Sequence, residues 1–421
     1  MKFSIGKTFL LGFGFFGVSV IWSVYNAYVP IFLQDRFLLA VGFIGIFMTL
    51  DNIAALFIQP AVGAWSDRIH TRLGRRLPFI LVGAPIAALA FIMLPLAGSL
   101  FAFFLASIAL LISMAVWRTP VVALMPDITP SKYRSQANGI INLMGGLGAI
   151  IAFIGGAKLY DMNPEYPFLM GAVLVLLAAI LVLIFIREPK IPENTEEDKP
   201  GIMSSIKTML NSPDRSEIRL LSAIFFWFVA YAGIEAFFTL FTKNYLLLPE
   251  SDGARMLGQL SLLFVIFAIP AGYIGSAVGR KKTIISGVTL MMLGVAAIFF
   301  IPPETQAALV TTLPLVGPIY SLSFIMMLLG VAWALININS LPMVVDMTDA
   351  VHIGTYTGLY YLFSTLAAII GPILYGGVIQ ASGGNYNLLM IVSPIFLLFA
   401  LLAMLGVKRG EAQVSSDLLV S

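Results

Sequence analysis

The sequence predicts an all-α polytopic membrane protein in which twelve transmembrane helices form two pseudo-symmetric six-helix bundles. Hydrophobic residues make up 59% of the chain and charged residues 11%, with a mean hydropathy of +0.97. Globular proteins carry about a quarter of their residues as charged side chains. Long apolar segments alternate with short polar breaks, and the two halves of the chain share residues at a fixed offset. Together these features predict a duplicated bundle in lipid.

The apolar segments have the length that a spanning helix needs, about 20 residues. Lipid offers no partners to backbone groups, so each segment must be helical. The first run continues for about 25 residues without a small-residue cleavage site, so we interpret it as a retained helix rather than a signal peptide. The predicted spans are 8–33, 40–64, 77–96, 101–126, 138–158, 167–186, 220–246, 256–278, 283–301, 316–340, 354–379 and 386–407.

The lysines and arginines predict the orientation of these spans. With the N-terminus inside, 19 of the 24 basic residues fall in cytoplasmic segments and 4 fall outside, while Arg118 lies within a span. Cytoplasmic loops are enriched in basic residues. We therefore expect a multi-pass protein of the inner (cytoplasmic) membrane with both termini in the cytoplasm.

An internal repeat divides the predicted spans into two sets of six. A shift of 219 positions places Asp127 on Asp346, Gly139 on Gly358 and Leu143 on Leu362. The predicted organisation is a bundle over 1–187, a cytoplasmic linker over 188–219, a second bundle over 220–409 and a tail over 410–421. Such parallel repeats place the substrate between the halves, near the middle of the membrane.

Several classes of function are disfavoured by composition. The chain has no cysteine, which excludes disulfides and thiolate sites, and its net charge of +3 gives no basic field for nucleic acid. His70 and His352 are far apart in the sequence without an acid cluster, and no phosphate-binding glycine loop follows a strand. We expect no enzyme activity, no catalytic residues, no metal site and no cofactor.

The loop after the second predicted helix reads Asp-Arg-Ile-His-Thr-Arg-Leu-Gly-Arg-Arg over residues 67–76. This pattern resembles the loop signature of the major facilitator superfamily. Its longer form is similar to the sucrose:proton symporters and the glycoside-pentoside-hexuronide:cation symporters. Pro120-Val-Val-Ala-Leu-Met-Pro-Asp127 and Ala137-Asn138-Gly139 carry a further match. The resemblance implies the major facilitator fold and secondary active transport of a sugar or glycoside.

The same loop predicts a cytoplasmic gate. Asp67 can pair with Arg68, Arg72 or Arg75, and ion pairs that form in only one conformation bias the equilibrium between open and closed states. The alternative is that these cations only fix the topology. The candidate gate residues are Asp67, Arg68, Arg72, Arg75, Arg76, Asp127, Arg134 and Asp346.

Asp51, Arg118 and Glu235 are charged residues at membrane depth, where each costs on the order of 3 kcal/mol. Their positions allow all three to share one cavity. Burial disfavours an ionised carboxyl and a nearby cation favours it, so an acid near Arg118 is expected to bind and release a proton. Alternatively, Arg118 and one acid form a permanent structural pair, or Asp51 only contacts polar neighbours such as Asn52.

The resemblance also limits the choice of coupling ion. Ala55 and Gln59 stand where the melibiose permease branch carries its cation-binding aspartates, which argues against a sodium site. The sucrose branch places an acid within its fourth helix, and this chain has none from 101 to 126. We therefore expect a proton to be the coupling ion and assign it to Asp51 or Glu235.

Aromatic and amide side chains at helical spacing predict the substrate site, because sugars stack on aromatic faces and hydrogen-bond to polar groups. Aromatic residues are also common in interfaces and in packing, which is the alternative for each of them. The candidates are Trp22, Tyr25, Asn26, Asn142, Trp227, Tyr231, Trp333, Asn337 and Tyr360.

These expectations describe a monomeric proton-coupled symporter that carries a sugar or glycoside through the bilayer by alternating access. An efflux carrier for drugs, lipids or other amphiphiles in the same fold is the first alternative. A membrane sensor that transports nothing is a remote one, because it would need a soluble output domain and only 188–219 is a long polar stretch.

Overall fold

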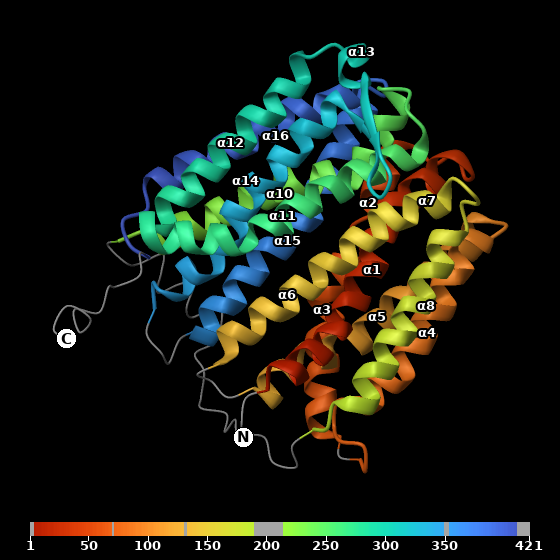
Figure 1. Cartoon of the computed structure of the whole chain (residues 1–421), viewed down its shortest axis with the longest axis vertical. Coiled ribbons are helices and arrows are strands. Elements are labelled where there is room, and N and C mark those ends of the chain that lie inside the picture. Colours follow the sequence, from red (N-terminus) through yellow and green to blue (C-terminus); the bar gives the residue numbers. More distant parts are fainter. Residues whose placement is uncertain (1–3, 70, 130–132, 189–213, 349–352, 411–421) are drawn as a thin grey trace.

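The computed structural model describes residues 4–69, 71–129, 133–188, 214–348 and 353–410. Within them, twelve helices are long and apolar enough to cross a membrane, and each overlaps one predicted span. The all-α architecture of two six-helix bundles is therefore confirmed (Figure 1). Most of the predicted linker and of the predicted tail lies outside the described residues.

The N-terminal bundle contains two spans that are not single α-helices. The second span is interrupted at Met48 and Thr49, and the fifth contains a π-helical turn, η2. Hydropathy does not report either irregularity, since both leave the segment apolar. The elements are α1 Ile5–Asp35, α2 Val41–Phe47, α3 Leu50–Arg68, α4 Leu77–Leu96, α5 Leu100–Ile128, α6 Arg134–Ile150, η2 Ile151–Gly155, α7 Gly156–Tyr160 and α8 Tyr166–Phe185.

The C-terminal bundle adds a β-hairpin before its fourth span. The predicted span 316–340 begins inside this hairpin, and the helix itself starts at Ser321 and ends at Val345. Gly317 at the turn has a φ of +86°, which suits glycine. The elements are α10 Ser216–Asn244, α11 Glu250–Val278, α12 Arg280–Phe300, α13 Pro303–Gln306, β1 Leu309–Leu313, β2 Gly317–Tyr320, α14 Ser321–Val345, α15 Ile353–Ala381, η3 Tyr386–Leu388 and α16 Leu389–Leu405.

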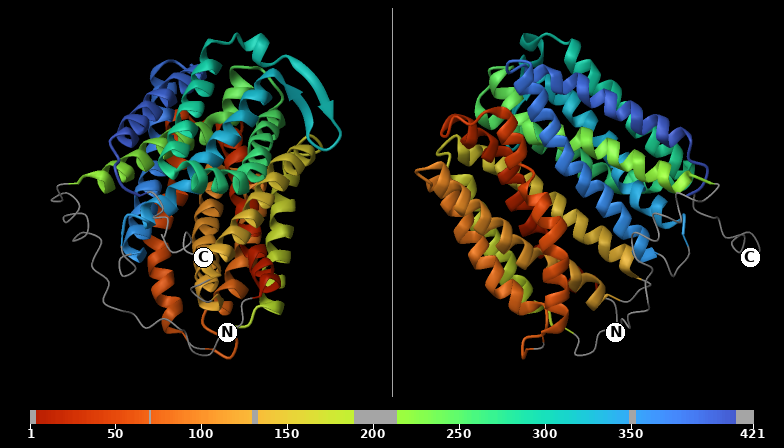
Figure 2. Two further views of the ribbon diagram at one scale, coloured as in Figure 1. Left: turned by 60° about the vertical axis from the view of Figure 1, so that its left-hand side comes forward. Right: turned by 180° about the vertical axis from the view of Figure 1, so that it is seen from behind.

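The two bundles repeat the same set of helix contacts. In the N-terminal bundle α1 packs on α6 and α8, α4 packs on α5 and α8, and α3 packs on α5. In the C-terminal bundle α10 packs on α15 and α16, α12 packs on α14 and α16, and α11 packs on α14. Each contact has its counterpart, so the helices are arranged as a duplicated unit (Figure 2).

The start of α1 and the end of α16 lie at one end of the molecule, which we call the terminal end. The β-hairpin lies at the opposite end, the hairpin end. Near the hairpin end the bundles touch through α2 with α15 and through η2 and α7 with α11. At Gly45 of α2 the chains approach so closely that an added Cβ would lie 2.3 Å from the Pro372 carbonyl oxygen.

Polar contacts at the hairpin end form a second connection between the bundles, which we call the hairpin-end seam. Lys243 pairs with Asp35 across the bundles and with Glu250 at 2.8 Å within its own bundle. Asn244 Nδ2 donates to Gln34 Oε1 at 2.8 Å. These contacts hold the two bundles together at this end.

A second part of the hairpin-end seam is centred on Arg255 of α11. Arg255 pairs with Asp161 of the other bundle and with Asp252 of its own helix. The Tyr320 hydroxyl donates to Asp252 Oδ2 at 2.5 Å, and Gln259 Nε2 donates to the Pro318 carbonyl at 3.1 Å. Burial raises the pKa of Tyr320, so its hydroxyl stays a donor. The hairpin is therefore tied to α11.

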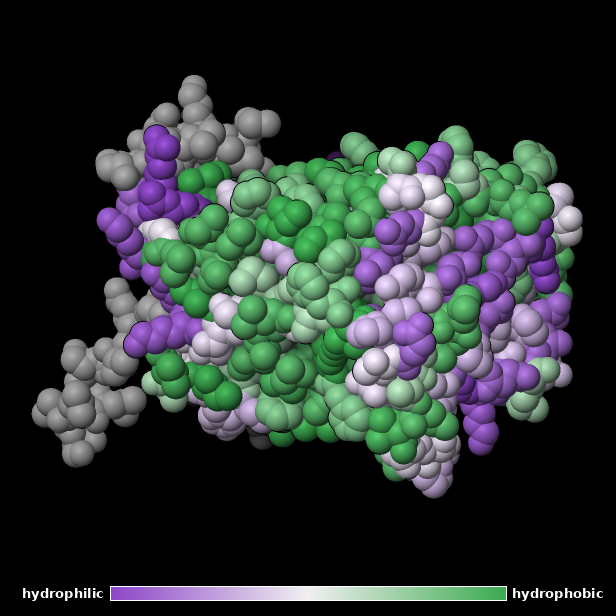
Figure 3. Space-filling view, turned by 90° about the horizontal axis from the view of Figure 1, so that it is seen from above, coloured by the Kyte–Doolittle hydropathy of each residue, from purple (hydrophilic) through white to green (hydrophobic). Residues whose placement is uncertain are grey.

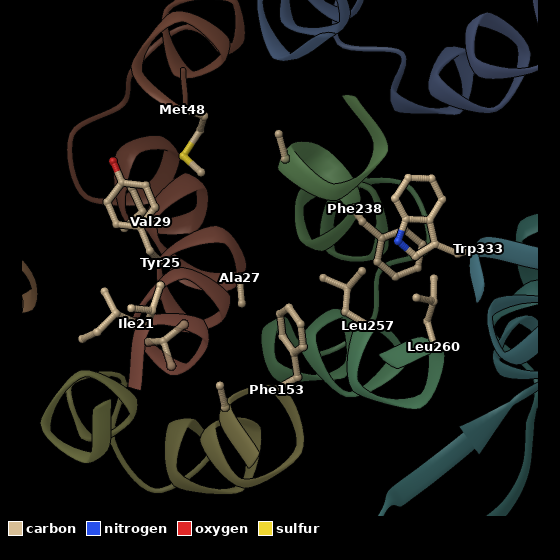
Figure 4. Close-up of a cluster of buried hydrophobic side chains, with 14 of the residues drawn as sticks. Ile21, Tyr25, Ala27, Val29, Met48, Phe153, Phe238, Leu257, Leu260 and Trp333 are labelled. Atoms are coloured by element: carbon tan, nitrogen blue, oxygen red, sulfur yellow. The ribbon is translucent and has the colours of Figure 1, made fainter. Parts of the chain in front are cut away.

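The outer surface is apolar where lipid would cover it. A broad hydrophobic band separates hydrophilic residues at the two ends of the molecule (Figure 3). The interior is also apolar, and Ile21 of α1, Phe153 of η2 and Leu257 of α11 belong to one buried cluster (Figure 4). Ionisable side chains between these apolar layers are therefore exceptional.

Candidate functional site

The three intramembrane charges come from three spans. By a rise of about 1.5 Å per residue, Asp51 of α3 and Glu235 of α10 lie roughly 26 and 28 Å from the terminal ends of their helices, and Arg118 of α5 lies about 15 Å from its own. The two acids therefore stand at similar depth, and Arg118 lies nearer the terminal end.

These charges act on one another in the structure. Asp51 interacts electrostatically with Arg118 and with Glu235, so the two bundles contribute to one charged group. Among the described residues, the Asp51 carboxylate accepts a hydrogen bond of 2.8 Å from Asn52 Nδ2 and makes no direct ion pair with Arg118. All three charged side chains are partly exposed.

Asn26 of α1 connects the second acid to the first bundle. Its side-chain amide lies beside the Glu235 carboxyl where α1 contacts α10. An amide can donate to a carboxylate and accept from a protonated carboxyl. Asn26 can therefore offer Glu235 a polar partner in either protonation state.

An aromatic group lies next to Glu235. The Tyr231 ring stacks on Trp333 with a centroid distance of 4.1 Å and an interplanar angle of 6°. Phe228 meets Trp333 edge-on at 5.3 Å, and the Tyr360 hydroxyl lies 3.1 Å from Ser340 Oγ. Tyr231, Trp333 and Tyr360 thus form part of one cluster.

The other predicted substrate residues are distributed differently. Trp227 and Tyr25 are fully buried, and neither the Trp227 indole nitrogen nor the Tyr25 hydroxyl has a hydrogen-bond partner within the described chain. Trp22 packs edge-on against Tyr25 at 5.6 Å. Asn337 is partly exposed and Asn142 is exposed. In this conformation Trp227 and Tyr25 therefore contribute to packing.

Four of the predicted gate residues meet at the terminal end of the N-terminal bundle. Arg75 pairs with Asp127 at 2.7 Å and with Asp67 at 3.6 Å. Arg76 pairs with Asp127 at 3.2 Å and also with Asp67. These pairs join the loop before α4 to the ends of α3 and α5, so they lie within one bundle.

The remaining gate candidates are placed as follows. Asp346 pairs with Arg280 in the C-terminal bundle, which repeats the pairing of Asp127 with a cation. Arg72 is exposed, and Arg68 has an interaction partner. Arg134 begins α6, and its side chain lies outside the described residues.

Glu188 completes this cluster and was not predicted. Its carboxylate accepts hydrogen bonds from the backbone N–H groups of Arg75, Arg76 and Leu77 at 2.7 to 2.8 Å, at the start of α4. Gly74 has a φ of +116°, and a Cβ there would lie 2.5 Å from the carboxyl carbon of Glu188. Glu188 therefore caps α4 from the end of the sixth span.

We expect Glu188→Ala to lower the free energy of unfolding by about 1 to 2 kcal/mol, because it leaves orphan N–H groups at a helix start. A thermal melt of the purified protein measures the change. Glu304→Ala, which removes an exposed acid at the hairpin end, is the control. An equal change in both variants would contradict the capping role.

Two parts of the site were not predicted. Tyr361 interacts electrostatically with Arg118 and is 56% exposed, but it was not among the candidate residues. The hairpin-end seam combines Gln34 and Asp35 with Lys243 and Asn244. These polar residues lie at the ends of the first and seventh spans, and their pairing depends on contacts between the bundles.

Comparison with known proteins supports the fold and a family. A family model described as Major Facilitator Superfamily matches residues 11–316 and 256–418. A bacterial homologue of the human lysosomal transporter Spinster, solved in an inward-facing and occupied conformation, superposes with a TM-score of 0.72. The two chains are 14% identical, and the match covers 94% of this chain and 95% of that one.

Curated relatives fall into two groups by their names. A class H tetracycline resistance protein from Pasteurella multocida is 24% identical over 59% of this chain and 62% of its own length. A sucrose transport protein from Oryza sativa subsp. japonica is 26% identical over 38% of this chain and 40% of its own. The matched region thus spans less than two thirds of either relative.

Proposed function

Because this chain belongs to the Major Facilitator Superfamily and is a membrane transporter, we propose that it carries a sugar or glycoside together with a proton. The superfamily match and the transporter neighbour indicate a transporter rather than an enzyme. The likeness to a sucrose transport protein supports a sugar as the substrate.

The observation that carries the proposal is the position of Glu235 beside the aromatic cluster and at the interface of the bundles. Stacked rings offer a flat apolar face to the CH surface of a sugar, and carboxyl and amide groups accept or donate to its hydroxyls. Tyr231 and Trp333 supply the first kind of contact, and Glu235 with Asn26 supplies the second.

A proton bound by Asp51 or Glu235 would remove a like-charge repulsion between the bundles. Asp51 interacts with Arg118 in its own bundle and with Glu235 in the other, so neutralising either acid alters forces across the interface. A ligand that binds one conformation better shifts the equilibrium toward it. Proton binding is thereby coupled to the movement of the bundles.

The conformation described here corresponds to a carrier closed at the hairpin end. The hairpin-end seam and the close approach at Gly45 join the bundles there, while the ion pairs at Asp127 and Asp346 stay within single bundles. The basic residues predict that the terminal end lies on the cytoplasmic side of an inner membrane. With that orientation, the conformation is an inward-facing state of a monomer.

Efflux of amphiphiles is the second candidate function. A narrow cavity inside the C-terminal bundle has Tyr231 and Glu235 at one side and otherwise apolar walls, including Leu257, Met291 and Met326. The relative named as a tetracycline resistance protein also favours this function. A thermal-shift screen of sugars, glycosides and amphiphiles separates the two candidates, because only the true substrate class raises the melting temperature.

Collapse of the proton gradient is expected to abolish uphill accumulation of the sugar. The measurement is uptake of the sugar identified by the screen into proteoliposomes, with and without a protonophore. Unchanged accumulation without a gradient would refute proton coupling and leave the sugar assignment intact.

Glu235→Gln is expected to separate coupling from exchange. Gln keeps the size and the polarity of Glu but does not titrate, so we expect at least a tenfold loss of uphill uptake with less effect on exchange of labelled for unlabelled sugar. Glu304→Gln, which neutralises an exposed acid at the hairpin end, is the control. Gln259→Glu does not serve as a control because the Gln259 side chain hydrogen-bonds to the hairpin. Equal loss of both activities would assign Glu235 to substrate binding instead.

A further inference from the structure

A cationic pocket lies at the terminal end, where the first turn of α10 meets the residues that follow α16. It has a volume of about 530 Å³ and is lined by Asp214, Arg215, Arg219 and Lys408. The Lys408 backbone N–H donates to Ser216 Oγ at 2.9 Å, and Arg219 Nη1 donates to the Gly406 carbonyl at 2.6 Å. These bonds fix the two helix ends to each other, so the wall of the pocket is built from two spans.

The acid in the pocket already has its partners. Asp214 accepts hydrogen bonds from Ser216 N at 3.0 Å and Ser216 Oγ at 2.7 Å, and it pairs with Arg409 at 2.5 Å. The hydrogen bonds from Ser216 lower the pKa of Asp214, so it is ionised, and Arg409 pairs both with it and with Glu217.

The cations of the pocket are not balanced in the same way. Arg215 and Lys408 are exposed, and within the described residues neither has an acidic partner. Arg219 donates only to a carbonyl in that set of residues. The start of α10, a helix of 29 residues, adds the partial positive charge of its dipole. The pocket therefore attracts an anion.

An apolar stripe on α16 leads away from this pocket. Leu398, Leu402 and Leu405 are 43%, 56% and 56% exposed. Their spacing of four and three residues puts them on one face of the helix. This face ends three residues before Lys408. A free phosphate would use only the pocket, whereas a phospholipid would use the pocket and the stripe together.

We propose that an acidic phospholipid binds here, with its phosphate in the pocket and its acyl chains along the exposed face of α16. Basic pockets between spans at the cytoplasmic side recognise acidic headgroups in this manner. The site brings α10, which carries Glu235, into contact with a lipid. The assignment stands independently of the substrate and of proton coupling.

The test uses the full chain and phosphatidylglycerol as the probe. Wild-type protein and Arg215→Gln/Lys408→Gln are exchanged into bilayers of phosphatidylcholine with increasing phosphatidylglycerol, and bound lipid is counted by native mass spectrometry. We expect wild-type protein to retain phosphatidylglycerol over phosphatidylcholine and the double variant to bind it roughly tenfold more weakly. Added salt should reduce the preference.

Lys158→Gln with Arg36→Gln, which removes two charges at the hairpin end, is the matched control and should bind phosphatidylglycerol as wild type does. Unchanged melting curves show that the variants are folded, since Arg215 and Lys408 are exposed. Equal binding by wild type and the pocket variant would overturn the proposal. Displacement of the lipid by millimolar inorganic phosphate would also overturn it, because the site would then be specific for the free anion.

Discussion

Gly45→Leu is expected to prevent closure at the hairpin end and to abolish transport. A Cβ at residue 45 would lie 2.3 Å from the carbonyl oxygen of Pro372. This oxygen belongs to the backbone of the opposite bundle, so it cannot move away as a side chain can. A steric penalty of about 3 kcal/mol on the closed state would shift its population about 100-fold. The variant should therefore stay open at the hairpin end.

The chain has no cysteine, so an introduced pair of cysteines can report this shift directly. Gln34→Cys and Asn244→Cys replace a pair whose side chains hydrogen-bond across the seam. We expect a short bifunctional thiol reagent to cross-link this pair in the Gly45 background and to fail in Gly45→Leu. Gly377→Leu, beside Gly376 but with no atom within 4 Å of an added Cβ, should cross-link normally. Full cross-linking in Gly45→Leu would refute the mechanism.

Asp51→Asn is expected to destabilise the protein and stop transport at the same time. It removes the acid that acts on Arg118 and leaves a cation at membrane depth without compensation. Insertion scales place the cost of such a charge at about 3 kcal/mol. Thermal melts should show lower stability, and uphill uptake should be lost even at full expression.

The double variant Asp51→Asn/Arg118→Gln separates stability from coupling. Neutralising Arg118 as well should restore most of the stability, since no unbalanced charge remains in the pair, but it should not restore uphill uptake. Asp51→Asn/Asn52→Asp, which moves the acid by one position, tests whether the location of the charge matters. If Asp51→Asn were as stable as wild type, the charges at Asp51 and Arg118 would not be coupled.

The number and order of the spans were predictable because a backbone inside a lipid bilayer has few ways to satisfy its hydrogen bonds. Every predicted span overlaps an observed helix, and the family expectation is confirmed by the family model. The equivalence of Asp127 and Asp346 followed from the repeat, and each pairs with a cation at the start of the preceding span of its bundle. The hydropathy of each segment and the internal repeat were sufficient to predict these features.

The rest depends on contacts between spans, which a single sequence does not specify. Tyr231 and Trp227 lie on one helical face by spacing, yet Tyr231 stacks on Trp333 while Trp227 is fully buried. Glu188 was invisible as a cap because its partners are more than 100 residues away in the chain. The second strand of the hairpin, Gly317–Tyr320, was predicted as the start of a helix, since an apolar strand and an apolar helix end have the same hydropathy.

The β-hairpin suggests how this carrier could be inhibited from its hairpin end. Tyr320 of the hairpin hydrogen-bonds to Asp252, and Asp252 pairs with Arg255. Arg255 in turn pairs with Asp161 of the other bundle. A molecule that binds the hairpin and α7 at the same time would hold the two bundles together without entering the substrate site. Such inhibition would be noncompetitive, and excess substrate would not relieve it.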